Sequence, residues 1–248
     1  MSRVAVVMAA GKGTRMKSDL PKVLFPILGR PMIEYVLDTL GAVGIERIIV
    51  VVGYRSDLVR ETLANYRNLV YVEQTEQLGT GHAVMMCRDE LTDVDCPVLV
   101  VAGDCPMIRR ESVQKLFESY EQNKTPACIL GTANKQNPAG LGRIVRDKSG
   151  NFQAIVEEKD ATEEQKKITE VNMSYYLFHS PDLLTALSSL KTNNAQKEYY
   201  ITDTPSILNK QGKKVLALPV LKPIESLGIN TVEELAAVEE AMKNEARG

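Results

Sequence analysis

The stretch VAVVMAAGKGTRMKSDLPK, residues 4–22, joins an apolar run to a glycine-rich loop and decides how the rest of the chain is interpreted. The run Val4–Met8 predicts a buried strand, because it is continuously apolar and does not alternate with polar residues. The loop after it offers the backbone N–H groups of closely spaced glycines, with Arg15 and Lys22 beside them. This combination indicates a phosphate-binding turn.

Two common phosphate-binding patterns do not fit this loop. The dinucleotide-binding pattern GxGxxG fails because Met16 stands where its third glycine is required. The Walker pattern fails because Gly13 is followed by Thr14, not by lysine and then serine or threonine. The glycines alone fit a plain tight turn equally well. Arg15 and the Pro21-Lys22 pair favour phosphate binding.

Apolar runs rich in valine and isoleucine alternate with helical periodicity through the first half of the chain. This alternation predicts an α/β fold, a mixed and mostly parallel sheet with helices on both faces. After the first strand, further strands are expected at residues 47–52, 69–72 and 98–101. Helices are expected from Pro31, after residues 79–81 and around residues 113–120.

From about residue 129 the pattern changes. GRIVRDKSGNFQAIVEEKD, residues 142–160, has two alternating segments around a Lys-Ser-Gly turn and predicts an antiparallel hairpin. We expect further helices at Ser180 and at residues 199–208, a strand at 215–220, and a last helix with the capping box Thr231 and Glu234. No linker rich in Pro, Gly and Ser separates the halves, so we expect a single domain, residues 1–248.

Composition restricts the partners. A net charge of −2 over 248 residues gives no general field to recruit nucleic acid or an anionic membrane. No signal peptide or membrane-spanning run is evident. The four cysteines form neither CxxC pairs nor a His-containing ligand set, so we expect reduced thiols in a cytoplasmic protein. The oligomeric state stays open.

Short motifs along nearly the whole chain resemble the sugar-1-phosphate nucleotidyltransferases, most closely the uridyltransferase domain of the bacterial N-acetylglucosamine-1-phosphate uridyltransferases. The motifs are MAAGKGTRMKSDLPKVL, EQLGTGHA, AGDCPMI, GLGRI, IVEEKDAT, EVN, EYYITD and GIN, starting at residues 8, 76, 102, 140, 155, 170, 198 and 228. The resemblance implies a Rossmann-like nucleotidyltransferase fold. Residues up to about 128 would bind the nucleotide, and residues from about 129 to 248 would bind the sugar.

The implied reaction transfers a nucleotidyl group from UTP to N-acetylglucosamine-1-phosphate, giving UDP-N-acetylglucosamine and pyrophosphate. The attacking phosphate is already an anion, so the protein has to position two polyanions and neutralise charge, with Mg²⁺ as the expected cofactor. Synthesis of UDP-glucose or a dTDP-sugar is the alternative within the same chemistry. A glycosyltransferase would be expected to carry a DxD motif, and a non-catalytic nucleotide-sugar sensor would not need the full set of charged residues.

The resemblance also assigns site residues. Arg15, Lys22 and Asp104 would be catalytic, and Asp104 with Asn230 would hold the metal, although GDCP by itself also fits a turn cap. Gln74 would read the base through its amide, although an exposed loop glutamine is the simpler interpretation. The nucleotide-binding residues would be Met8, Ala9, Ala10, Gly11, Lys22, Gln74, Gly79 and Thr80. The sugar-binding residues would be Gly103, Gly142, Glu157, Asn172, Tyr199 and Thr202.

The chain departs from the family pattern around the sugar. Ala102 replaces a usual tyrosine, and Met173-Ser174 replaces threonine-glycine after Asn172. The pocket would lose an aromatic hydroxyl and gain a flexible apolar side chain beside Asn172, so we expect it to be reshaped and less selective. His82 and His179 lack spacing for a metal site or triad and are predicted to be structural. Many relatives continue into a β-helix acetyltransferase domain, whereas this sequence stops after AMKNEARG, so acetyl transfer is not expected.

Overall fold

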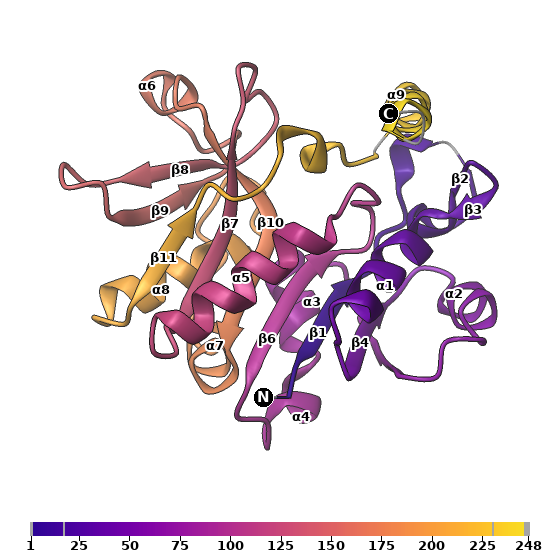
Figure 1. The fold of residues 1–248 in the computed structure, drawn as a ribbon, viewed down its shortest axis with the longest axis horizontal. Coiled ribbons are helices and arrows are strands. Elements are labelled where there is room, and N and C mark those ends of the chain that lie inside the picture. Colours follow the sequence, from indigo (N-terminus) through magenta and orange to yellow (C-terminus); the bar gives the residue numbers. More distant parts are fainter. Residues whose placement is uncertain (1, 17, 230, 246–248) are drawn as a thin grey trace.

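The computed structural model describes residues 2–16, 18–229 and 231–245, and within them a nine-stranded sheet crosses the molecule (Figure 1). The strands lie in the order β11-β7-β10-β6-β1-β4-β5, with the β8–β9 hairpin attached to β10. The sheet strands are β1 Val4–Met8, β4 Arg47–Val52, β5 Leu69–Glu73, β6 Pro97–Ala102, β7 Cys128–Asn134, β8 Arg143–Arg146, β9 Phe152–Val156, β10 Glu170–His179 and β11 Val215–Leu218. A separate short hairpin is made of β2 Pro26–Ile27 and β3 Arg30–Pro31.

Helices cover both faces of the sheet. They are α1 Met32–Ala42, α2 Ser56–Thr62, α3 Thr80–Met85, α4 Arg88–Leu91, α5 Arg110–Gln122, α6 Glu163–Lys166, α7 Ser180–Leu187, α8 Thr204–Lys210 and α9 Val232–Glu245. Short 3-10 turns are η1 Thr14–Met16, η2 Lys22–Leu24, η3 Ile201–Asp203 and η4 Pro223–Ser226. Helices α1, α2 and α5 contribute to the core on one face with Ala5 and Val7, whereas α3, α4, α7 and α8 join the core on the other face with Val4 and Val6.

The first part of the sheet is parallel, because β1 pairs with β4 and β6, and β4 pairs with β5. Strands β1, β4 and β6 are rich in valine and buried, as their unbroken apolar runs predict. The predicted α/β fold, a mixed sheet with helices on both faces, is confirmed. Since the carboxyl ends of parallel strands meet at one edge, the loops after β1, β5 and β6 gather there.

Strand β10 runs antiparallel between β6 and β7 and brings the second half of the chain into the same sheet. Its pairing with β7 shifts between Asn172 and Tyr175, and Ser174 inside this bulge has a φ of 58°. The expected hairpin is present as β8 and β9, and its turn contains Gly150 with a φ of 83°. The sheet is therefore continuous across the expected boundary near residue 128.

Two expected helices near the start of the chain have different bounds. The helix expected from Pro31 begins at Met32, because Pro31 pairs with Pro26 in the β2–β3 hairpin. The helix expected after residues 79–81 is divided into α3 and α4, since Cys87 leaves helical backbone geometry, with φ −83° and ψ 4°.

Two bounds near the end of the chain also differ from the prediction. The helix expected at residues 199–208 begins only at Ile201 as η3 and becomes α8 at Thr204. The strand expected at residues 215–220 ends at Leu218, because Pro219 has no N–H to continue the ladder.

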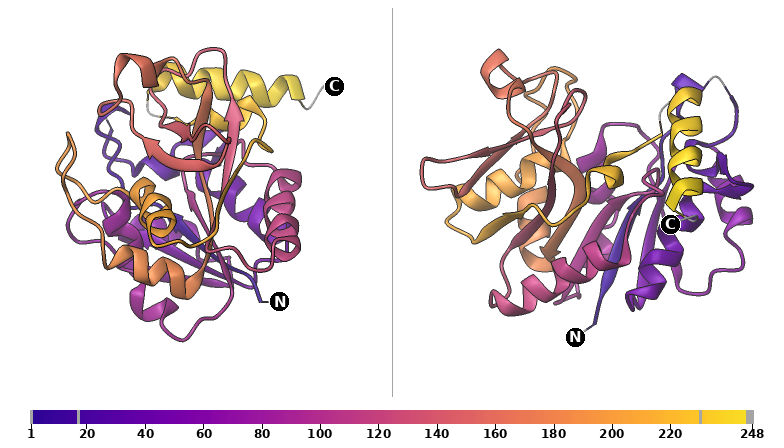
Figure 2. Two further views of the ribbon diagram at one scale, coloured as in Figure 1. Left: turned by 90° about the vertical axis from the view of Figure 1, so that its left-hand side faces the viewer. Right: turned by 45° about the horizontal axis from the view of Figure 1, so that its top comes forward.

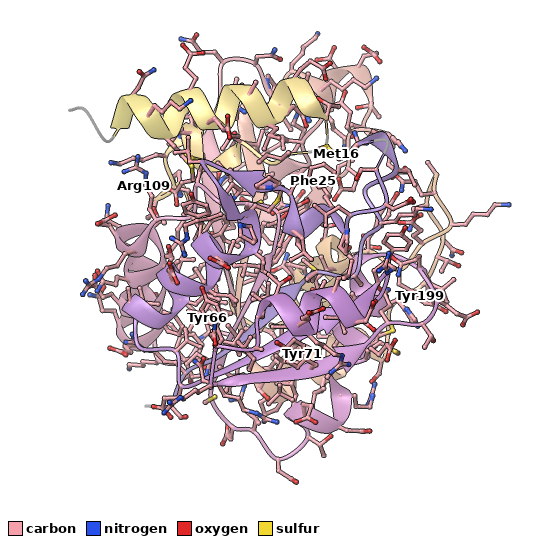
Figure 3. The ribbon with its side chains drawn as sticks, turned by 90° about the vertical axis from the view of Figure 1, so that its right-hand side faces the viewer. Met16, Phe25, Tyr66, Tyr71, Arg109 and Tyr199 are labelled. Carbon is pink, nitrogen blue, oxygen red and sulfur yellow. The ribbon has the colours of Figure 1, made fainter. Side chains whose placement is uncertain are left out.

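The final helix α9 returns to the N-terminal part of the molecule and contacts β2 (Figures 1 and 2). Figure 3 shows Met16 and Phe25 beneath this helix. The buried apolar cluster at this contact consists of Met16, Ile27, Met32, Met107, Ile229 and Val238. One hydrogen bond of the predicted capping box is present, because the Glu234 N–H donates to the Thr231 hydroxyl at 3.2 Å. Within the described ranges, no helix has the length and apolar character needed to cross a membrane.

Candidate functional site

Two adjoining cavities lie at the carboxyl edge of the parallel strands. The smaller has a volume of about 300 Å³ and the larger of about 560 Å³. They share Met8, Thr80, Ala102 and Asp104, so the end of β1, the start of α3 and the end of β6 form the border between them. We refer to them below as the small and the large cavity.

The small cavity is built largely from backbone and small side chains. The Ala9 N–H donates to the carbonyl of Val51 at 2.9 Å, and this bond extends the β1–β4 pairing into the glycine loop. Gly11 has open space where a Cβ would stand, and it lines the cavity. All the residues predicted to bind the nucleotide line the small cavity: Met8, Ala9, Ala10, Gly11, Lys22, Gln74, Gly79 and Thr80.

Gln74 is buried, with 3% of its surface exposed, so the interpretation as an exposed loop residue is wrong. Its Nε2 donates to the Gly79 carbonyl at 3.1 Å and lies 3.1 Å from His82 Nδ1. With Nδ1 as acceptor, both amide protons are used and the amide oxygen stays available as an acceptor. His82 thereby orients Gln74, and it also stacks on Tyr199 with ring centroids 6.3 Å apart.

The turn before α3 requires glycine. Gly79 has a φ of 106°, and a Cβ on it would lie 2.6 Å from the carbonyl oxygen of Tyr199. The Gly81 N–H donates to that same carbonyl at 2.7 Å. The segment that precedes η3 is therefore held against the turn that lines the small cavity. Glu198, in this segment, also lines the small cavity.

Lys22 and Asp104 meet at the border of the two cavities. Lys22 Nζ lies 2.5 Å from Asp104 Oδ2, and both side chains are largely but not fully buried. Gly13 makes room for the lysine, since a Cβ there would lie 2.8 Å from Lys22 Cβ. The two residues predicted to handle phosphate and metal are thus in direct contact.

The other predicted catalytic and metal-binding residues are placed differently. Arg15 is exposed in η1 and lines the large cavity, not the small one. Asn230 lies outside the described residues. Within those residues, no three His, Cys, Asp or Glu side chains gather in a way that could hold a metal ion. Of the two residues predicted to hold the metal, Asp104 is therefore the one whose position the structure describes.

The large cavity contains the polar side chains predicted to bind a sugar. Gly142, Glu157, Asn172 and Thr202 all line it. Burial raises the pKa of Glu157, and a hydrogen bond from Thr202 acts in the opposite direction. A Cβ on Gly142 would lie 3.0 Å from Ile155, so the backbone of Gly142 packs closely against β9.

The bulge in β10 orients the amide of Asn172. Its Nδ2 donates to the Tyr176 hydroxyl at 2.7 Å, and its Oδ1 accepts from the Ser174 N–H at 3.3 Å. Met173 was expected to be a flexible side chain beside Asn172, but it is only 3% exposed and packs in the core with Tyr175. Met173 is therefore held by packing, and Tyr176 provides an aromatic hydroxyl in the cavity wall.

Gly103 and Tyr199 were predicted to bind the sugar, but neither lines the small or the large cavity. The Gly103 N–H donates to the Met8 carbonyl at 2.9 Å, so this glycine lies between its cavity-lining neighbours Ala102 and Asp104. Tyr199, labelled in Figure 3, stacks on His82 and packs against the core.

Sequence reasoning missed Lys135 and Ser226, which both line the large cavity. Lys135 Nζ donates to the Ser226 hydroxyl at 2.5 Å, and burial lowers the pKa of Lys135. Lys135 directly follows β7, a strand that was not among those predicted, so no predicted element marked it. Ser226 belongs to a turn that no motif marked.

Glu225, the neighbour of Ser226, is fully buried and was also missed. Its carboxylate accepts hydrogen bonds from the Ser112 hydroxyl at 2.7 Å, the Lys222 N–H at 2.8 Å and the Arg109 N–H at 3.1 Å. Several donors compensate the cost of burying this carboxylate. Glu225 therefore fastens η4 to the N-terminus of α5, and this contact fixes the wall of the large cavity.

This arrangement can be compared with known proteins. Residues 5–201 match the family described as the MobA-like NTP transferase domain. The chain belongs to this family. The family resemblance that the sequence motifs indicated is thereby confirmed.

Curated relatives of this NTP transferase domain include the "Bifunctional protein GlmU" of Streptococcus thermophilus (strain CNRZ 1066), which is 44% identical over 243 residues. That of Clostridioides difficile (strain 630) is 42% identical over 243 residues. Both alignments cover 98% of this chain and 52% of the relative, so the chain spans about half the length of these proteins.

Among solved structures, a UDP-glucose pyrophosphorylase complexed with UDP-glucose is similar to this NTP transferase domain with a TM-score of 0.77 and 20% sequence identity. The similarity covers 99% of this chain and 100% of that chain. The Rossmann-like nucleotidyltransferase fold expected from the motifs is therefore confirmed.

Proposed function

We propose that the protein transfers a uridylyl group from UTP to N-acetylglucosamine-1-phosphate, giving UDP-N-acetylglucosamine and pyrophosphate. The observation that carries the proposal is the contact of Lys22 with Asp104 at the border of the two cavities. The small cavity would hold the nucleotide, and the large cavity would hold the sugar. The relatives named GlmU, at 42% to 44% identity over nearly the whole chain, support this choice of substrates.

The base would bind beside Gln74. Its amide oxygen, left available by the bonds to Gly79 and His82, can accept a hydrogen bond from the N–H of uracil. The backbone of Ala10 and Gly79 lines the same cavity and can contact the rest of the base edge. A buried and oriented amide discriminates more strongly than an exposed one, because a mismatched base would leave it unpaired.

The phosphates of both substrates would meet at Lys22. This ammonium lies at the border of the cavities, where it can bind the triphosphate from one side and the sugar phosphate from the other. Arg15 lines the large cavity on an exposed turn and can bind further phosphate oxygens as a fork of N–H donors. Alignment and charge neutralisation are the main requirements of this reaction, because the attacking oxygen needs no deprotonation.

Asp104 would hold Mg²⁺, and its environment fits this cofactor. It presents a partly exposed carboxylate next to the proposed phosphate site, and Mg²⁺ prefers a few carboxylate oxygens together with substrate phosphates and waters. When bound, the metal would neutralise charge on the leaving pyrophosphate. The Lys22 ammonium forms an ion pair with the Asp104 carboxylate, so the charge of this carboxylate is compensated.

The second candidate is synthesis of another nucleotide sugar, such as UDP-glucose. Ala102 and Met173 favour it, because neither supplies the hydroxyl side chain that the family pattern has at its position. Both candidates use the same cavities and phosphate chemistry, so they differ only in the substituents that the large cavity accepts.

The direct test is to incubate the purified protein with each nucleoside triphosphate and a panel of sugar-1-phosphates and to follow pyrophosphate release. We expect the fastest release with UTP, N-acetylglucosamine-1-phosphate and Mg²⁺, and little release when the metal is chelated. Preferred use of glucose-1-phosphate would support the second candidate. No release with any pair of substrates would contradict nucleotidyl transfer.

A further inference from the structure

Lys135 is a cation of the large cavity that the family motifs do not include. It follows β7 directly, lines the cavity and donates through Nζ to the Ser226 hydroxyl at 2.5 Å. Among the described residues, no carboxylate forms an ion pair with it. A half-buried ammonium with one neutral partner keeps N–H donors available for an anion.

The position of Ser226 shows which end of the cavity this ammonium faces. Ser226 precedes Gly228 by two residues, and a Cβ on Gly228 would lie 4.0 Å from the carbonyl oxygen of Asp104. The chain from Ser226 to Gly228 therefore runs along the wall beside Asp104, and all of it lines the cavity. Glu225 fixes this segment from behind, since its carboxylate accepts from Arg109, Ser112 and Lys222.

The substrate offers one group that suits this ammonium. Of the parts of N-acetylglucosamine-1-phosphate, only the phosphate is an anion, and it must approach Lys22 and Asp104 for the reaction to occur. We propose that Lys135 binds the phosphate of the sugar-1-phosphate and thereby places it for attack. This inference rests on the proposed function, and it makes Lys135 a substrate-binding residue in addition to those of the family motifs.

The test compares Lys135→Met with Lys148→Met. Methionine keeps most of the length and volume of the lysine stem but removes the charge. We expect the KM for N-acetylglucosamine-1-phosphate to rise about 10- to 100-fold in Lys135→Met, the range that corresponds to losing one charge-assisted hydrogen bond, with the KM for UTP nearly unchanged. Lys148 lies exposed in the β8–β9 turn, so its variant should behave as the wild type.

Calorimetric binding separates this inference from the proposed function, because it needs no turnover. Wild type and Lys135→Met are each titrated with N-acetylglucosamine-1-phosphate and with N-acetylglucosamine. A loss of affinity confined to the phosphorylated sugar, partly restored by Lys135→Arg, supports the inference even if the wild type prefers another sugar in turnover.

Three results would overturn the role of Lys135. Equal affinity of wild type and Lys135→Met for the sugar phosphate would show that Lys135 does not bind this phosphate. If both proteins still released pyrophosphate, the proposed function would stand. The same loss with the unphosphorylated sugar would mean that Lys135 contacts the sugar ring or supports the fold. A loss seen only with a sugar-1-phosphate that carries a carboxylate would assign the ammonium to that carboxylate. A melting curve for each variant checks the fold.

Discussion

The small and the large cavity lie next to each other but are built in different ways. The small cavity is formed where parallel strands end, and much of its surface is backbone and small residues such as Ala9, Ala10 and Gly11. The large cavity combines residues from the antiparallel strand β10, from the segments that flank the β8–β9 hairpin, and from η4 and α9. In the proposed reaction, the phosphates and the base would be bound mainly by the backbone of the small cavity, whereas the sugar would be bound by separate side chains of the large cavity.

This difference suggests which changes each cavity tolerates. A backbone-lined site keeps its donors whatever the neighbouring side chains are, so its binding properties change little by single substitutions. A site made of side chains from distant segments changes with each of them, and Met173 and Ser174 are examples in this chain. Single substitutions are therefore expected to change the choice of sugar more readily than the choice of nucleotide.

The largest effect is expected at Asp104, which belongs to both cavities. Asp104→Asn keeps the size of the side chain but removes the charge that would hold the metal, so kcat should fall about 100- to 1,000-fold. Steady-state rates of pyrophosphate release measure it, and the exposed Asp93→Asn is the matched control. A nearly normal kcat with an unchanged melting temperature would show that Asp104 is only a turn residue.

Replacing Arg15 tests which of the two substrates this side chain binds. Arg15→Ala should raise the KM for UTP about 10- to 100-fold and affect the sugar-1-phosphate less, because a guanidinium can grip triphosphate oxygens with two N–H donors. Exposed Arg67→Ala is the control. Since Arg15 lines the large cavity, a larger effect on the sugar-1-phosphate would assign it to that substrate instead.

Glu157 gives the large cavity a dependence on pH that the small one should lack. Burial raises the pKa of Glu157 above its ordinary value of 4.5, so this carboxylate gains its proton at a higher pH than an exposed glutamate. The protonated group accepts fewer hydrogen bonds from sugar hydroxyls. The KM for the sugar-1-phosphate should therefore rise as the pH falls through this raised pKa.

Comparison with Glu157→Gln isolates this titration from that of the substrate phosphate. The variant should have a KM for the sugar-1-phosphate raised about tenfold at neutral pH, and it should lack the additional rise on acidification. The exposed Glu118→Gln should follow the wild type. Identical pH profiles for wild type and Glu157→Gln would show that Glu157 does not bind the sugar.

The smallest effect concerns the choice of sugar. With Ala102 in place of tyrosine, the cavity lacks one hydroxyl near the sugar, so kcat/KM for N-acetylglucosamine-1-phosphate should exceed that for glucose-1-phosphate by only about tenfold. Ala102→Tyr should increase this ratio. The ratio is measured for both proteins with UTP in excess. A wild-type preference of several orders of magnitude would mean that Tyr176 and its neighbours already restore a selective pocket.

The sequence predicted the small cavity well because local patterns determine it. The strand Val4–Met8 is evident from its continuous apolar residues, and the loops after parallel strands must meet at one edge. The family motifs then supplied residue roles, and all the predicted nucleotide residues line one cavity.

The large cavity was predicted less completely, since it depends on contacts between distant segments. Ser226 has no local signal, because its partner Lys135 follows β7. Glu225 accepts locally from the Lys222 N–H, but its contacts with Arg109 and Ser112 join segments far apart in the chain. Tyr199 stands within a motif, yet its ring packs against His82, a contact that spacing along the chain cannot indicate. The bulge at Ser174 likewise follows from the pairing of β10 with β7, not from the residues of β10 alone.

The cluster beneath α9 has a consequence for the order in which the protein can form during its synthesis. Met16, at the end of the loop that carries Arg15, is buried against Ile229 and Val238, which follow it by more than two hundred positions in the chain. A ribosome releases the N-terminal strands first, so β1 and its loop emerge long before the helix that covers them. A nascent chain can thus complete its parallel sheet while this loop still has its methionine exposed to water. The loop proposed to bind the triphosphate is therefore covered only after α9 has emerged.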